Sequence, residues 1–142
     1  MSTIIRTISR KLFPFILLYG LYIITYGHLS PGGGFQGGVV LASGVILLCL
    51  SQGVLETRRR ITYELCGFLE VGGILIFIML GVIAILLGYG FLTNILPLGE
   101  AGGTFSGGQI LWLNLAIGLK VGGGISTLFY VMAGFMRTNG DR

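Results

Sequence analysis

The chain has 142 residues, of which 54% are hydrophobic and 10% charged, and its mean hydropathy is +0.92. This little polar surface cannot cover a water-soluble globule, so the composition excludes an ordinary soluble domain and makes the lipid bilayer the solvent. The net charge of +4 would suit nucleic acid, but the basic residues stand in short clusters at the ends of apolar runs, a pattern that orients membrane proteins. We therefore expect a multi-pass membrane protein with no nucleic-acid partner.

Four apolar runs follow one another along the chain and predict an all-α integral membrane fold with four transmembrane helices. A single membrane domain is expected over residues 1–142. Its predicted spans are about 4–27, 36–55, 65–92 and 110–136. Pro14 is expected in the first turn of its helix, where the missing N–H does little harm, and residues 56–64 are expected to form a polar loop.

The distribution of lysine and arginine predicts the topology. Three of these residues stand in the N-terminal segment 1–11, three stand together in the 56–64 loop, and two follow the last span. The turn at 28–35 and the loop at 93–109 contain none. Because basic loops stay in the cytoplasm, both termini are expected to be cytoplasmic and the turn at 28–35 to face outside.

A polar, glycine-crowded turn separates the first two spans, with the sequence His-Leu-Ser-Pro-Gly-Gly-Gly-Phe-Gln-Gly-Gly at 28–38. It contains a G-x-G-x-x-G match, but that dinucleotide fingerprint requires a preceding strand in a soluble βαβ unit. Here an apolar helical segment precedes it. The sequence therefore favours a tight turn between two membrane helices.

Small residues at four-residue spacing predict close helix packing. Gly34, Gly38 and Ala42 form such a row leading into the second span, and Gly118 and Gly122 form another in the fourth. Rows of this kind let the backbones of two helices approach each other in a membrane.

Apart from the basic N-terminal segment 1–11, two ionisable residues lie inside predicted spans. Each costs at least about 2.5–3.5 kcal/mol on insertion scales, so Glu70 and Lys120 require a reason to be there. Measured from the cytoplasmic ends of their spans, they lie about 8 Å and about 24 Å deep at 1.5 Å per residue, which argues against a direct pair. Glu70 can reach the interface or Arg58–Arg60. Lys120 must line a hydrated path, meet an acidic residue of another subunit, or extend to the interface.

The remaining polar candidates are Asn114 in the fourth span and His28, the one histidine. His28 is expected to hydrogen-bond the turn, with a ligand or proton-relay role as the alternative. The two cysteines, Cys49 and Cys66, lack metal-ligand spacing and are expected to be small buried hydrophobes. We expect no metal, no cofactor and no catalytic site in this chain.

The 28–38 turn, at the outer end of the first of four spans, resembles the signature of the MnhB/MrpB subunit family of multi-subunit cation/proton antiporters. The motif residues are His28, Pro31, Gly32, Gly33, Gly34, Phe35, Gly37 and Gly38. Gly-Tyr-Gly-Phe-Leu at 88–92 is similar to a second patch of that family. The likeness covers essentially the whole chain.

This resemblance implies a small helical subunit that does not work alone, within an assembly of a prokaryotic cell membrane that exchanges Na+ for H+. Related modules occur in membrane-bound hydrogenases and sulfur reductases of archaea, so the chain could also serve an ion-translocating oxidoreductase complex. The family pattern implies an acidic residue near Asn114 and apolar residues at Glu70 and Lys120. The departures at these positions favour the respiratory type of module.

Two principal hypotheses follow. In the first, the chain lines or braces the cation/proton path, and the candidate path residues are Lys120, Glu70, Asn114 and His28. In the second, it is a structural adaptor whose glycine-lined helices hold larger transport or redox subunits together. A small transporter that works alone is a third possibility.

Overall fold

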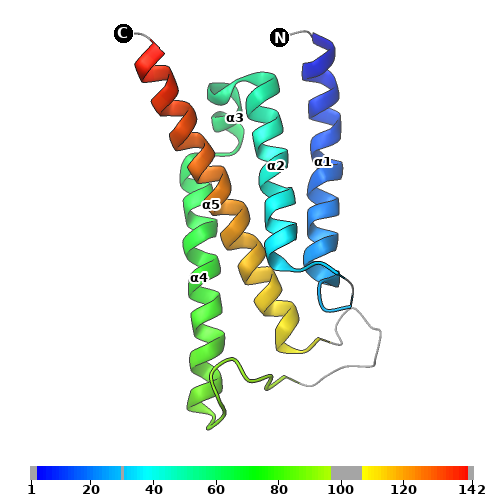
Figure 1. The fold of residues 1–142 in the computed structure, drawn as a ribbon, viewed down its shortest axis with the longest axis vertical. Helices are drawn as coiled ribbons and strands as arrows, with labels where there is room; N and C mark the ends of the chain where they lie inside the picture. The colour runs from blue at the N-terminus through cyan, green and yellow to red at the C-terminus, as the bar shows by residue number, and fades with distance from the viewer. Residues whose placement is uncertain (1–2, 30, 97–106, 141–142) are drawn as a thin grey trace.

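The computed structural model describes residues 3–29, 31–96 and 107–140, and for 136–140 it describes the backbone alone. This part of the chain is helical, as predicted. The helices are α1 (Thr3–Tyr26), α2 (Gly34–Gln52), α3 (Val54–Arg60), α4 (Tyr63–Leu86) and α5 (Gln109–Gly140), shown in Figure 1. Four of them, α1, α2, α4 and α5, are long and apolar enough to cross a membrane, which confirms the predicted all-α membrane fold.

The first helix starts within one residue of the predicted start of the first span, but the place of Pro14 in it differs from the prediction. It runs without interruption from Thr3, so Pro14 lies inside the helix and not in its first turn. The missing N–H of Pro14 leaves the carbonyl of Arg10 without its usual helical donor. The basic residues of the N-terminal segment 1–11 therefore lie in the same helix as the apolar stretch that follows them.

The segment predicted as a polar loop at 56–64 contains a short helix, α3. Gly53, with φ 93°, reverses the chain between the end of α2 and this helix. Glu56 then pairs with Arg60 one turn later, at 3.7 Å, and three arginines occupy the last turn. Both features favour a helix, because opposite charges at i, i+4 attract and cations suit a helix C-terminus.

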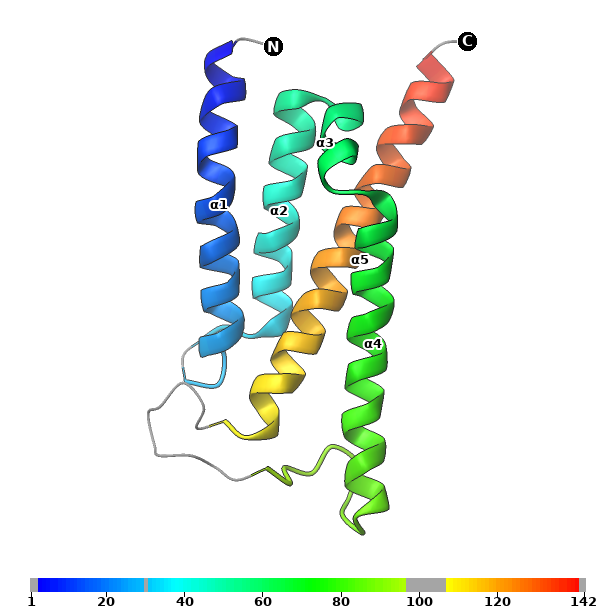
Figure 2. The ribbon, with the colours of Figure 1, turned by 180° about the vertical axis from the view of Figure 1, so that it is seen from behind.

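The long helices form an open row in the order α1, α2, α5, α4. Helix α2 packs on α1 and on α5, α4 packs on α5, and α1 touches α5 only briefly. The ribbon in Figures 1 and 2 shows that the start of α1 and the end of α5 lie at the same end of the row. We call this the termini end, and the opposite end, where α2 and α5 begin, the turn end.

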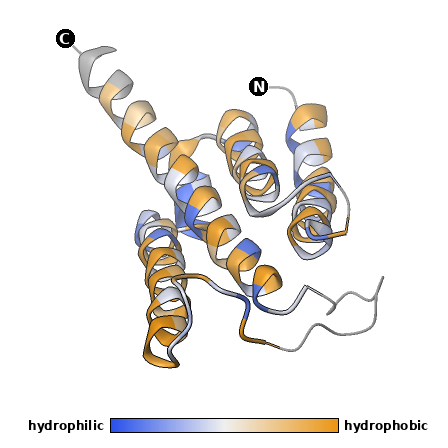
Figure 3. Cartoon of the chain, turned by 60° about the horizontal axis from the view of Figure 1, so that its bottom comes forward, coloured by the Kyte–Doolittle hydropathy of each residue, from blue (hydrophilic) through white to orange (hydrophobic). Residues whose placement is uncertain are grey.

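An open row leaves much apolar surface uncovered. Within the described residues, α1 buries only Ser9, Gly20 and Ile24, and α4 buries four small residues. Figure 3 shows hydrophobic residues on all sides of α4 and along α1. The row is therefore not a closed bundle with its own complete core. Its uncovered apolar faces suit contact with lipid or with another subunit.

Candidate functional site

The 28–38 turn brings the ends of α1, α2 and α5 together at the turn end. The imidazole ring of His28 lies against Gly107, where a Cβ would come within 2.9 Å of two ring atoms. Gly33, with φ 144°, precedes α2, and its carbonyl accepts the N–H of Gly37 at 3.1 Å. Glycine is needed at Gly33 because this φ is unfavourable for side-chain-bearing residues. Ser30 lies outside the described residues.

The predicted small-residue row of α2 lies against α5. A Cβ on Gly34 would collide with the carbonyl of Asn114, and a Cβ on Gly38 would lie 2.8 Å from the carbonyl of Gly118. The two helices run in the same direction and meet backbone to backbone, as small-residue rows permit. Gly122 has more space, since the nearest atom to its Cβ would be 3.4 Å away.

A second face of α2 packs on α1. A Cβ on Gly37 would collide with Ile24, and one on Gly20 would meet Leu41 at 2.7 Å. Ile24 is fully buried, and a Cβ on Gly118 would also approach it. The glycines of α2 therefore allow this helix to fit between two others.

The interface between α4 and α5, which we call the seam, contains Glu70 and Lys120, the two charged residues predicted inside the later spans. A Cβ on Gly73 would lie 2.5 Å from the carbonyl of Ala116 and 2.7 Å from the nitrogen of Lys120. One turn nearer the termini end, the carboxylate of Glu70 lies against Gly124, whose Cβ would be 3.2 Å from Oε1. The two helices are antiparallel and closely packed throughout this stretch.

This seam changes the depth estimate made from the sequence. Lys120 stands level with Gly73, only three residues, or about 4.5 Å of helix rise, from Glu70. The two helices do not end at a common height, because α5 extends to Gly140, well past the start of α4 (Figure 1). No ion pair joins Glu70 and Lys120 within 4.0 Å in the described structure. Glu70 is half-buried beside α5 and makes no ion pair there with the α3 arginines.

Lys120 is exposed in an apolar hollow, which we call the Lys120 groove, on one side of the helix row. The groove has a volume of about 420 Å³ and lies between α4, α5 and the start of α2. It is lined by Phe35, Gly73, Ile74, Phe77, Ala116, Ile117, Lys120 and Val121. Within it, Lys120 is the one charged residue.

The four candidate path residues fall into two groups. Asn114 is half-buried, with its Nδ2 3.0 Å from a Cβ built on Gly27, so its amide faces the turn beside His28. Six residues, or about 240° of helix rotation, separate Asn114 from Lys120. The structure therefore brings Glu70 near Lys120 and His28 near Asn114, but does not bring the four together.

A buried glutamine at the start of α5, Gln109, was not predicted as a site residue. Gln109 is 1% exposed, its N–H donates to Asn94 Oδ1 at 2.9 Å, and its Oε1 accepts the N–H of Ile95 at 3.4 Å. Its Nε2 donates to the carbonyl of Leu80. Gln109 thus ties the described start of the loop to α4 and α5. Pro97 and Glu100 lie outside the described residues.

The cysteines are free and buried. Cys49 of α2 and Cys66 of α4 belong to one apolar cluster with Val45 and Tyr130, and the hydroxyl of Tyr130 donates to the carbonyl of Ile61 at 2.9 Å. Among the described residues, no group of three or more His, Cys, Asp or Glu side chains is placed to hold a metal ion.

Fold and site together define a class: a multi-pass membrane protein whose open helix row presents a charge at membrane depth and large apolar faces to its surroundings. Residues 4–127 match the family described as "Domain related to MnhB subunit of Na+/H+ antiporter". The chain belongs to this family, and the resemblance seen in the 28–38 turn is confirmed.

Comparison with individual relatives agrees with this family assignment. The chain is 30% identical over 140 residues to an uncharacterized protein of Methanocaldococcus jannaschii, MJ1307, covering 93% of this chain and 52% of that protein. It is 31% identical over 91 residues to a Na(+)/H(+) antiporter subunit from Bacillus subtilis, covering 64% of this chain and 63% of the other. This chain therefore spans only about half to two thirds of the length of these relatives.

A solved structure resembles the whole row. It is a chain of the membrane-bound sulfane sulfur reductase (MBS), an archaeal respiratory membrane complex, with a TM-score of 0.69 and 31% identity. The likeness covers 93% of this chain and 58% of the other.

Proposed function

We propose that this chain is a small membrane subunit of an Mrp-type Na+/H+ antiporter module, lining or bracing the cation/proton path of a larger complex. Membership of the MnhB family supports the antiporter module. The likeness to a chain of an archaeal respiratory complex supports a setting in which such a module is joined to redox subunits. Its partners would be other membrane subunits, with Na+ and H+ as the transported ions.

The observation that carries the proposal is the position of Lys120. This cation lies about 16 Å of helix rise from the start of α5 and is exposed in an apolar groove. A charge at this depth costs at least about 2.5–3.5 kcal/mol facing lipid, so it requires water or a carboxylate. Among the described residues no carboxylate lies within ion-pair distance of Lys120, so we infer that another subunit or a hydrated path meets this side chain at the Lys120 groove.

Glu70 strengthens this assignment. Its carboxylate lies on the same seam, about one helical turn from Lys120, without an ion-pair partner in the described residues. Ionisable groups facing the interior of a membrane assembly commonly mark ion or proton routes. The seam of α4 and α5 is therefore the part of this chain that would border such a route.

The adaptor hypothesis is the second candidate, and the glycine faces of α2 favour it. Gly34 and Gly38 pack against α5, and Gly37 packs against α1. These residues stabilise the helix row and have no part in binding ions. In this case the charges would serve only to dock neighbouring subunits. The two candidates differ in what neutralising Lys120 does to an assembly that still forms.

Purification and reconstitution test the proposal. The chain, tagged at its C-terminus and expressed from its own gene cluster, should copurify with other membrane subunits in fixed stoichiometry. The purified assembly should exchange Na+ for H+ in liposomes, and the isolated chain should not. Exchange by the isolated chain would identify a transporter that works alone, and an assembly inactive in exchange would contradict the antiporter assignment.

A further inference from the structure

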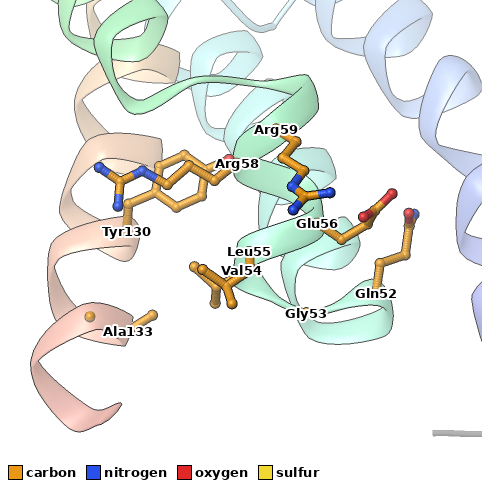
Figure 4. Close-up of a pocket in the computed structure, with 10 residues that line it drawn as sticks. Gln52, Gly53, Val54, Leu55, Glu56, Arg58, Arg59, Tyr130 and Ala133 are labelled. Carbon is orange, nitrogen blue, oxygen red and sulfur yellow. The ribbon is translucent and has the colours of Figure 1, made fainter. Parts of the chain in front are cut away.

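The termini end contains a second hollow, distinct from the Lys120 groove, which we call the arginine pocket. It has a volume of about 750 Å³ and lies between the end of α2, α3 and α5 (Figure 4). It is lined by Gln52, Gly53, Val54, Leu55, Glu56, Arg58, Arg59, Tyr130, Ala133 and Gly134.

Two guanidinium groups stand at this pocket and are accessible. Arg58 lies over the ring of Tyr63, with its central carbon 5.6 Å from the ring centre, which leaves the N–H groups at the edge of its plane able to donate. Arg59 is exposed and has no hydrogen bond or ion pair within the described residues. Arg60, by contrast, is paired with Glu56, which also reduces the negative charge that Glu56 brings to the pocket.

A further polar residue of the pocket wall is Gln52, to which two arginines of α1 donate hydrogen bonds. Gln52 is 8% exposed. Its backbone carbonyl accepts a hydrogen bond from Arg6 at 3.2 Å, and its Oε1 accepts one from Arg10 at 3.0 Å. These contacts use the oxygens of Gln52 and leave its side-chain NH2 as a donor. They also bring the basic residues of α1 and α3 to one end of the row. The described cations here are Arg6, Arg10, Lys11, Arg58, Arg59 and Arg60, against Glu56 and Glu64.

The other walls of the pocket are apolar. Val54 and Leu55 of α3 face Ala133 of α5, and Leu55 remains 59% exposed. The pocket lies where α2, a helix of membrane-spanning length, ends at Gln52, which is the level of the lipid headgroups. An occupant must therefore combine an anionic group for the arginines with an apolar part for these walls.

We propose that the arginine pocket binds an anionic phospholipid. The phosphodiester accepts hydrogen bonds from Arg58 and Arg59, and the upper part of an acyl or isoprenoid chain lies along Val54 and Ala133. Basic pockets between membrane helices recognise anionic headgroups in this way, and arginine suits phosphate because its donors form a planar fork. A pocket of this volume is far larger than inorganic phosphate requires. This assignment needs only that the row spans a bilayer, so it stands apart from the transport proposal.

Lipid-dependent stability of the purified protein tests the site. Adding phosphatidylglycerol to detergent micelles should raise the thermal midpoint more than phosphatidylcholine at the same molar ratio. The variant Arg58→Gln/Arg59→Gln should need about 30-fold more phosphatidylglycerol for half of that rise, because each arginine near an anionic surface contributes about fivefold in affinity. The variant Lys11→Glu changes the charge of the same end by the same two units but leaves the pocket and its Glu56–Arg60 pair intact, so it should resemble the unaltered protein.

Ala133→Trp separates the pocket from surface charge. It fills the cavity while keeping every arginine, and should abolish the preference for phosphatidylglycerol even if the arginine variant fails to fold. Equal stabilisation by both lipids, or equal losses in Arg58→Gln/Arg59→Gln and Lys11→Glu, would overturn the proposal. Displacement of the lipid by millimolar inorganic phosphate would assign the site to free phosphate. A lipid effect seen in the isolated chain but absent from the assembly would assign the pocket to a partner subunit.

Discussion

Gly73 lies directly against the backbone of Lys120, so close that a Cβ on Gly73 would be 2.7 Å from the nitrogen and 3.0 Å from the Cβ of Lys120. This contact sets the height of α4 against α5. It also turns Lys120 toward the groove beside Phe35 and Phe77. The seam glycine thus positions the one charged residue of the Lys120 groove.

Gly73→Ala should destabilise the protein by roughly 1–3 kcal/mol, because the added methyl group meets backbone atoms that cannot move independently. The thermal midpoint of the purified protein in detergent measures this effect. Gly72→Ala is the matched control, since a Cβ there meets nothing within 4 Å and alanine favours a helix. Equal midpoints for the two variants would show that α4 and α5 are not packed as closely as described.

Gly38→Ala should weaken the contact of α2 with α5 by a similar amount. Its Cβ would stand 2.8 Å from the carbonyl of Gly118 and 2.8 Å from the Cβ of Val121. Gly122→Ala lies on the same interface but meets atoms only from 3.4 Å outward, so it should be tolerated. Yield and thermal midpoint of the assembled complex measure both. The reverse order of severity would contradict this helix register.

Gln109→Ala should cost roughly 1–3 kcal/mol, because it removes the buried side-chain amide that bonds the N–H of Ile95 and the carbonyl of Leu80. The exposed Gln36 at the start of α2 provides a control, and Gln36→Ala should change the thermal midpoint little. If Gln109→Ala proves no worse than Gln36→Ala, Gln109 does not anchor the loop.

The helices themselves were predictable because long uncharged runs have few alternatives in a bilayer. Their relative heights were not, because nothing in the sequence states how far α5 extends past the start of α4. The α3 helix was missed although its Glu56 and Arg60 have helical spacing, since seven residues give too short a pattern. The four-residue spacing of these opposite charges was the available signal, and in the structure they pair at 3.7 Å.

The candidate site was predicted in its residues but not in its grouping. Glu70 and Lys120 stood out because charges are rare in spans, yet only the seam shows them one turn apart. Gln109 gave no signal, because a polar residue between a loop and a helix is ordinary. The arginine pocket combines α3 with the end of α5, segments about 70 residues apart, which no local pattern could join.

Glu70 and Lys120 should act together in the assembled complex. With only about 4.5 Å of helix rise between them, each charge changes the electrostatic environment of the other. The effects of Glu70→Gln and Lys120→Gln on Na+/H+ exchange should therefore be non-additive in a double-mutant cycle. Purely additive effects would mean that the two residues do not border one path.

The central claim is that Lys120 borders an ion path shared with another subunit. The most direct measurement is sodium-driven proton movement in everted membrane vesicles containing the whole assembly, with either Lys120→Gln or Lys120→Arg. Lys120→Gln should lower exchange at least about tenfold while the subunit stoichiometry stays intact, since losing a buried charge interaction is worth more than about 1.4 kcal/mol. Lys120→Arg, which keeps the charge, should retain most of the activity. Normal exchange in Lys120→Gln, or loss of the assembly itself, would contradict the claim.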